Sequence, residues 1–202
     1  MASFVTSNSK SLSGSIRVPG DKSISHRSII LGSIATGTTR VSGFLQGEDS
    51  LATLNAFKDM GVLIKRDGSD VTIQGVGMHG LNAPTKPLNL GNSGTSIRLM
   101  SGLLSAQSFD SELCGDESLS KRPMARVIEP LRQMGADISG PDSMPPLSIN
   151  GGKNLSAIEY TMPVASAQIK SCILLAGLYS KGTTTVIENG ISRDHTERML
   201  KG

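Results

Sequence analysis

Three stretches of the chain repeat one pattern of apolar and polar positions. Each begins with a short strand-like run, turns through small residues that include Ser or Thr, continues as a helix that is apolar nearly all round, and ends in a second strand-like run. They read SIRVPGDKSISHRSIILGSIATGTTRVSG, LNLGNSGTSIRLMSGLLSAQSFDSELCG and YTMPVASAQIKSCILLAGLYSKGTTTVIENG. When they are superposed, Arg27, Arg98 and Lys170 fall in register, at spacings of 71 and 72 residues. This regularity predicts an internal repeat whose first helix is buried.

A second, more polar helix pattern follows each stretch and stops at a glycine, the residue that commonly follows a helix C-terminus. These patterns read DSLATLNAFKDMG, KRPMARVIEPLRQMG and SRDHTERMLKG. After Gly61 and Gly135 come pairs of strand-like runs, the first pair hinged at Asp67 and Gly68, which is a hairpin signal. The predicted unit is β-α-β-α-β-β, over approximately residues 13–78, 86–152 and 156–202, and the third copy stops before its hairpin.

Units of this kind bury their apolar helices against one another, which predicts a mixed α/β (α+β) fold. We expect residues 1–202 to form one incomplete domain with the first helices inside. A linear solenoid is the competing arrangement, but helices that are apolar nearly all round favour a closed one.

The composition is that of a globular protein. Hydrophobic residues make up 37% of the chain, enough for a sizeable core, but only 3% are aromatic and none is Trp. The 20 basic and 17 acidic residues are interspersed and give a net charge of +3, which argues against a nucleic-acid-binding tail. Because no apolar run reaches membrane-spanning length and the N-terminal residues lack the apolar stretch of a secretory signal, we expect a soluble cytoplasmic protein with reduced cysteines.

Cations stand near the starts of the predicted helices, where acidic residues are normally preferred. Lys22, Arg27, Arg98, Arg122 and Arg193 all occupy such positions. Free backbone N–H groups, hydroxyls and a nearby cation together form a site for a phosphate or carboxylate. The Gly-Asn-Ser-Gly turn at residues 91–94 matches neither a dinucleotide loop nor a P-loop, so a small phosphorylated metabolite is the better hypothesis.

Groups for acid-base or metal catalysis are not evident. The three histidines have no metal-ligand spacing with cysteines or carboxylates, so we expect no metal, and His26 is interpreted as a packing or hydrogen-bonding residue. Asp49, Asp116 and Glu117 precede predicted helices, where N-capping is the simpler role. No catalytic residue is therefore assigned.

Several of these segments are also the motifs of a known family. From Leu12 onward, KSISHR, GNSGT with a nearby Arg, KRPM, ASAQIKS and RDHTERML occur in the order and spacing of 5-enolpyruvylshikimate-3-phosphate synthases, which this chain closely resembles. The resemblance implies a fold of two domains, each with three such units around a pseudo-threefold axis. It also implies transfer of the carboxyvinyl group of phosphoenolpyruvate to the 5-hydroxyl of shikimate 3-phosphate, a step of aromatic amino-acid biosynthesis that needs no cofactor.

The resemblance also assigns roles to residues at the helix starts. Those implied to bind shikimate 3-phosphate are Lys22, Ser23, Arg27, Ser166, Ala167, Gln168 and Arg193. Those implied to bind phosphoenolpyruvate are Lys22, Gly94, Arg122 and Gln168. Arg98 fits the repeat but matches no ligand of the family, so we expect it to be structural.

Relatives of this family are roughly twice as long, and their second half carries the catalytic Asp and Glu. We therefore expect this chain to bind the substrates without turning them over, and to have the missing C-terminal half as its partner. In relatives the first strand-forming residues belong to the second domain, so residues 11–17 are expected to be loose. The segments ASAQIKSCILLAGL and RDHTERML resemble those of the glyphosate-tolerant branch of the family, but tolerant relatives often carry Ala at the position of Gly94.

Two other functions remain open from the residues alone. A UDP-N-acetylglucosamine enolpyruvyl transferase shares the fold, but its acceptor motif begins Lys-Asn and its loop cysteine has no counterpart here. A non-catalytic binding module for nucleic acid or protein would suit the sequence pI of about 9.0. Such modules usually need aromatic stacking platforms, and the chain has two Tyr, four Phe and no Trp.

Overall fold

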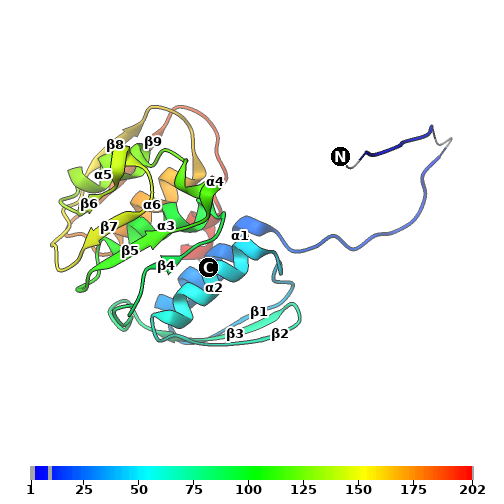
Figure 1. Cartoon of the computed structure of the whole chain (residues 1–202), viewed down its shortest axis with the longest axis horizontal. Coiled ribbons are helices and arrows are strands. Elements are labelled where there is room, and N and C mark those ends of the chain that lie inside the picture. The colour runs from blue at the N-terminus through cyan, green and yellow to red at the C-terminus, as the bar shows by residue number, and fades with distance from the viewer. Residues whose placement is uncertain (1–2, 9–10, 202) are drawn as a thin grey trace.

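The computed structural model describes residues 3–8 and 11–201. Its N-terminal residues form an extended arm that leaves the folded body (Figure 1). Up to Gly20 the described residues contain neither helix nor strand, and the side chains of Leu12, Ile16 and Val18 are 93%, 89% and 71% exposed. The strand predicted within SIRVPG is therefore wrong for this structure. Its apolar alternation is strand-like, but the arm leads away from the body and has no sheet edge to pair with.

The first unit contains two helices over an antiparallel sheet. Its elements are α1 (Lys22–Ile34), β1 (Thr36–Val41), α2 (Glu48–Asp59), β2 (Leu63–Asp67) and β3 (Asp70–Val76). The strand order is β1-β3-β2, and the predicted hairpin between β2 and β3 forms with Gly68 at a φ of 54°. Ile29 from α1, Phe57 from α2 and Ile73 from β3 are fully buried between these layers.

The second unit has the order β4-β5-β7-β6, with β4 parallel to β5 and the other pairs antiparallel. The helix pattern around KRPM divides at Pro123 because a proline disfavours helical conformation in the residue before it, here Arg122. The elements are β4 (Leu88–Asn89), α3 (Gly94–Leu104), β5 (Ser111–Cys114), α4 (Glu117–Ser120), α5 (Ala125–Gln133), β6 (Asp137–Ser139), the 3-10 turn η1 (Pro141–Ser143) and β7 (Leu147–Asn150).

The third unit begins like the second, with two parallel strands joined through a buried helix. Its elements are β8 (Glu159–Met162), α6 (Ala167–Gly177), β9 (Thr185–Glu188) and α7 (His195–Lys201). The glycines after α2 and α5, Gly61 and Gly135, have φ values of 89° and 95°, as predicted for residues that end helices. Gly202 lies outside the described residues.

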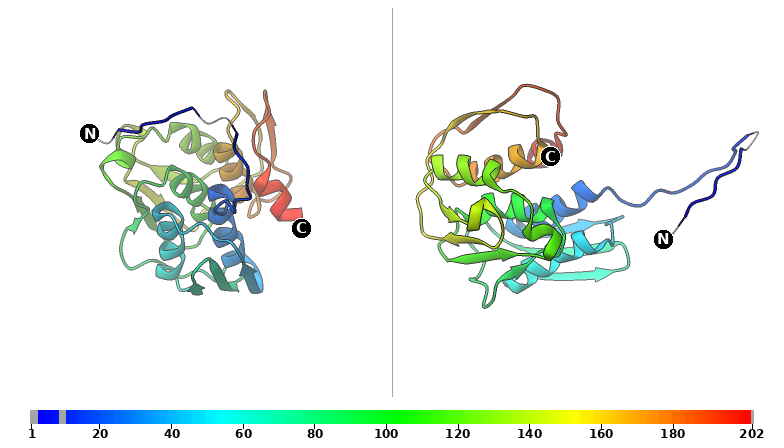
Figure 2. Two further views of the ribbon diagram at one scale, coloured as in Figure 1. Left: turned by 90° about the vertical axis from the view of Figure 1, so that its right-hand side faces the viewer. Right: turned by 45° about the horizontal axis from the view of Figure 1, so that its top comes forward.

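The first helices of the three units form the centre of the body. α3 contacts both α1 and α6, and the three sheets lie outside them (Figures 1 and 2). All three helices are largely buried, which their nearly uniform apolar pattern predicted. The α/β fold with a repeated unit is thus confirmed, and the linear solenoid is wrong. The division into one incomplete domain of three units stays a prediction, which the three separate sheets support.

Candidate functional site

The three central helices begin with capping side chains and no acidic residue in the first turn. Asp21 accepts from Ile24 N at the start of α1, Ser93 from Ser96 N at α3, and Ser166 from Ile169 N at α6, at 2.8, 3.1 and 3.4 Å. Gly94 and Ala167 are the first residues of α3 and α6. The starts of α3 and α6 therefore carry no carboxylate that would compete with an external anion, whereas the Asp21 carboxylate already occupies the start of α1.

Four residues that the sequence assigns to shikimate 3-phosphate are linked by one hydrogen-bond network. Arg193, exposed before α7, donates from Nη1 to Ser23 Oγ at the start of α1 over 2.8 Å. Arg27 donates from Nη1 to the Ser23 carbonyl oxygen at 3.0 Å and from Nη2 to Ser171 Oγ at 2.6 Å. The Ser171 hydroxyl donates to the Ala167 carbonyl oxygen at 2.6 Å. Residues from α1, α6 and the segment before α7 thus meet at one place.

Arg27 is far more buried than the sequence suggested. Its side chain is only 3% exposed, and Nε donates to Thr196 Oγ1 at 2.6 Å. Burial lowers the pKa of its guanidinium, and the nearby charge of Arg193 lowers it further. In this structure Arg27 holds Ser23 in place, and its direct contact with a phosphate stays a prediction.

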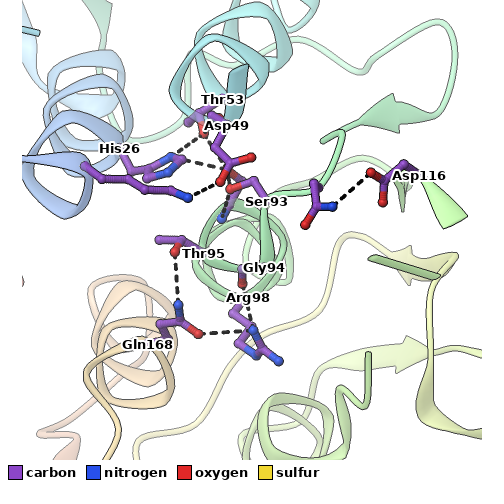
Figure 3. Close-up of polar contacts among 12 residues, drawn as sticks. His26, Asp49, Thr53, Ser93, Gly94, Thr95, Arg98, Asp116 and Gln168 are labelled. Atoms are coloured by element: carbon purple, nitrogen blue, oxygen red, sulfur yellow. Dashed lines mark hydrogen bonds and ion pairs between the residues drawn. The ribbon is translucent and has the colours of Figure 1, made fainter. Parts of the chain in front are cut away.

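Gly94 and Gln168, two residues assigned to phosphoenolpyruvate, lie around a second centre (Figure 3), and Arg122, a third, reaches Gly94. Gln168 donates from Nε2 to Thr95 Oγ1 at 3.0 Å, which joins the first turns of α6 and α3. An ideal Cβ at Gly94 would lie 2.8 Å from a guanidinium nitrogen of Arg122 and 2.8 Å from one of Arg98, so both side chains reach the start of α3.

A cavity of about 410 Å³ opens beside this centre, with Arg98, Arg126, Ser166 and Gln168 in its wall. Within residues 3–8 and 11–201, none of Arg98, Arg122 and Arg126 forms an ion pair. Burial lowers the pKa of Arg98, and the charges of Arg122 and Arg126 lower it further. An anion bound in the cavity would relieve this repulsion, and Arg-rich sites suit phosphate and carboxylate groups.

Lys22 is less closely tied to these groups, whereas Ser166 caps α6 and lies in the cavity wall. Lys22 Nζ forms a salt bridge with Asp49 on α2, and among the described residues it makes no hydrogen bond to the side chain of Ser23 or Gln168. Asp49 lies inside α2, whose cap is Gly47, so its predicted capping role is wrong. Asp116 caps α4 as predicted, accepting from Leu119 N at 2.8 Å, while Glu117 is the first residue of that helix and pairs with Lys121.

A buried polar network connects α1, α2 and the start of α3 (Figure 3). The predicted packing or hydrogen-bonding role of His26 is confirmed, but its partners were not predicted. His26 Nδ1 lies 2.7 Å from Thr53 Oγ1 and 3.3 Å from Ser96 Oγ, and Ser96 Oγ lies 2.6 Å from Ser93 Oγ. Burial lowers the pKa of His26 to about 4, so the ring is neutral at pH 7. Thr53 and Ser96 are polar and yet fully buried. The sequence signal that could have revealed this network is the presence of polar residues on helix faces that are otherwise apolar.

Other candidate chemistry is limited in the part of the chain that the structure describes. It contains no group of His, Cys, Asp and Glu side chains suited to a metal ion. None of its helices is long and apolar enough to cross a membrane. Cys172 is buried and Cys114 is half-buried, and both are free thiols.

Comparison with known proteins gives a consistent match. The family model for EPSP synthase (3-phosphoshikimate 1-carboxyvinyltransferase) matches residues 6–202. The chain belongs to the EPSP synthase family. A 3-phosphoshikimate 1-carboxyvinyltransferase of Ruthia magnifica subsp. Calyptogena magnifica is 64% identical over 202 residues, which are 100% of this chain and 46% of that protein. One of Legionella pneumophila (strain Corby) is 58% identical over 202 residues, 100% of this chain and 47% of that protein.

Solved structures of the EPSP synthase family agree with the fold. An EPSP synthase from Acinetobacter baumannii superposes with a TM-score of 0.90 at 62% identity, covering 93% of this chain and 43% of that one. The chain therefore spans under half the length of the relatives it matches. The match favours this family over the UDP-N-acetylglucosamine enolpyruvyl transferases.

Proposed function

We propose that this chain carries the shikimate 3-phosphate site, and part of the phosphoenolpyruvate site, of a 3-phosphoshikimate 1-carboxyvinyltransferase. The observation that carries the proposal is the contact between Arg193 and Ser23. These residues are 170 positions apart, the resemblance assigns both to the phosphate of shikimate 3-phosphate, and a 2.8 Å hydrogen bond joins them. Arg193 is exposed and forms no ion pair among the described residues, so its charge is available to a ligand.

The second substrate would bind at the starts of α3 and α6. Gly94 brings backbone close to the ligand, Arg122 contributes a positive charge, and Gln168 contributes an amide between the two substrates. The proposed reaction joins the 5-hydroxyl oxygen to the central carbon of phosphoenolpyruvate, passes through a tetrahedral adduct and releases phosphate. Cations that surround a transferring anion stabilise the charge that develops there.

Acid-base groups for this reaction remain unassigned in the chain. Asp49 is paired with Lys22, and Glu188 and Glu197 are paired with the buried Lys170. Positioned acid-base groups typically contribute about 10²–10⁴-fold in rate. We therefore propose that turnover needs the remaining length of the relatives, which would act as this chain's partner in a cytoplasmic enzyme of aromatic amino-acid synthesis.

The proposal is tested by phosphate release from shikimate 3-phosphate and phosphoenolpyruvate. One sample contains this chain alone, and a second adds a polypeptide with the part of the Ruthia magnifica relative that this chain does not match. We expect release only in the mixture. The matched control is a mixture made with the Arg193→Met chain, which should lose rate mainly at low shikimate 3-phosphate. Release by the chain alone, or none by the mixture, would contradict the proposal.

A further inference from the structure

Arg98 connects three segments that carry proposed ligand-binding residues. Its Nη1 donates to the Gly94 carbonyl oxygen at 3.0 Å and to Gln168 Oε1 at 3.1 Å. Its Nη2 donates to the carbonyl oxygen of Pro123, the residue that follows Arg122, at 3.4 Å. One half-buried guanidinium thus holds the starts of α3 and α6 (Figure 3), and it also holds the segment before α5.

We propose that Arg98 is a positioning residue that fixes the side-chain amide of Gln168, so that Gln168 presents an N–H group to the phosphoenolpyruvate site. The inference rests on the proposed function, because it takes Gln168 as a residue that contacts the substrates. Arg98 itself needs no contact with either substrate for this role.

The chemistry of the two side chains sets the orientation of the amide. A guanidinium has only donors, so the Gln168 atom that faces Arg98 must be the oxygen Oε1. The amide nitrogen then faces Thr95 Oγ1, to which it donates at 3.0 Å. An amide nitrogen carries two hydrogens, and the described contacts use one of them. The second N–H is left for an oxygen of a ligand.

A neighbouring arginine separates this role from simple attraction of anions. Arg126 lines the same cavity and its charge lowers the pKa of Arg98, but its side chain is exposed and makes no hydrogen bond within the described part of the chain. Loss of either arginine removes one positive charge from the cavity, and only loss of Arg98 removes the contact with Gln168. Arg126→Met is therefore the matched control for Arg98→Met.

The repeat supports a positioning role on independent grounds. Arg27, in register with Arg98, likewise donates to the carbonyl oxygen four residues earlier, that of Ser23. It also reaches α6, through Ser171. In both units the cation ties the first turn of its own helix to a neighbouring helix, so the arrangement at Arg98 follows the architecture of the unit.

The direct readout is the side-chain amide of Gln168 in the NMR spectrum of the ¹⁵N-labelled chain, identified by its absence in Gln168→Glu. Arg98→Met should shift this signal and speed its hydrogen exchange, and Arg126→Met should leave it unchanged. Arg98→Lys keeps the charge without the planar fork, and should also shift it. An amide signal that is unaltered in both Arg98 variants would overturn the proposal.

The functional readout is phosphoenolpyruvate affinity measured by calorimetry in the presence of shikimate 3-phosphate. Arg98→Met should weaken it about tenfold, as expected for one charge-assisted contact, and Arg126→Met should weaken it less. Equal losses in the two variants would show that only charge matters and would overturn the proposal. If the unaltered chain binds neither substrate, the proposed function fails, while the amide readout still decides whether Arg98 positions Gln168.

Discussion

Replacement of Gly102 by alanine should destabilise the protein, although alanine is the better helix former. Gly102 lies in the buried part of α3, where an ideal Cβ would stand 2.1 Å from the Cys172 carbonyl oxygen on α6 and 2.8 Å from its carbonyl carbon. Those atoms are backbone, so no side-chain rotation can relieve the overlap. The two helices must move apart by about 1 Å to restore ordinary contact.

The magnitudes determine the sign of this change. Alanine gains about 1 kcal/mol over glycine in a helix interior, while overpacking of this kind costs about 1–3 kcal/mol and sometimes more. Because the clash is with backbone, we place the cost at the upper end, which leaves a net loss of about 2 kcal/mol in the free energy of unfolding. The same displacement would separate Arg98 on α3 from Gln168 on α6.

Urea unfolding followed by circular dichroism measures this loss, as a lower midpoint with an unchanged slope. The control is Gly177→Ala at the end of α6, where the three atoms nearest to a Cβ all belong to the Thr184 side chain, at 3.0–3.4 Å. That variant should change stability by less than about 0.5 kcal/mol. If Gly102→Ala is as stable as the unaltered chain, the close approach of α3 and α6 is not as tight as described.

Three further predictions concern single side chains. Burial lowers the pKa of His26 to about 4, so at acidic pH the unfolded chain binds a proton more readily than the folded chain does. The free energy of unfolding, measured by urea unfolding at a series of pH values, should therefore fall by about 3 kcal/mol as the pH drops from 6.5 toward 4. His26→Gln should flatten this part of the series. Gly94→Ala should displace the guanidinium groups of Arg122 and Arg98. It should weaken phosphoenolpyruvate binding about tenfold and leave the affinity for shikimate 3-phosphate unchanged. Equal losses of affinity for the two ligands, measured by calorimetry, would instead indicate a folding defect. Lys170→Met leaves Glu188 and Glu197 without the cation that each contacts at 2.7 Å. The free energy of unfolding should fall by about 2 kcal/mol. A thermal midpoint of unfolding that does not change would contradict this prediction.

Most of the fold could be predicted from the sequence because local signals coincide with the repeat. The register of Arg27, Arg98 and Lys170 marked the three buried helices, and Gly61, Gly68 and Gly135 marked turns that need a positive φ. Two elements differ from the prediction: the helix pattern around KRPM divides at Pro123, and the first strand does not form. The first strand is the larger departure. Its residues have strand-like alternation, but a strand also needs a partner edge, and alternation alone cannot supply that information.

The candidate site could be predicted only as a set of residues, and the contacts among them could not. Hydrogen bonds such as Arg193 to Ser23 or Gln168 to Thr95 join positions far apart in the chain, which spacing does not reveal. The sequence also did not show that Arg27 is buried, because arginine is rarely fully buried and the polar partners of Arg27 lie far along the chain. Its network is set by Thr196 and Ser171, two small polar residues from other elements.

Whether the chain recognises the phosphate of its ligand is decided by calorimetric titration with shikimate 3-phosphate and with shikimate. We expect shikimate 3-phosphate to bind, and shikimate, which lacks the phosphate, to bind at least about tenfold more weakly, as the loss of one charge-assisted contact would give. Arg193→Met is the variant to titrate beside the unaltered chain, because Arg193 is exposed and its loss should leave the fold intact. Equal affinity for the two ligands, or an affinity for shikimate 3-phosphate that Arg193→Met leaves unchanged, would show that the phosphate does not bind at Arg193.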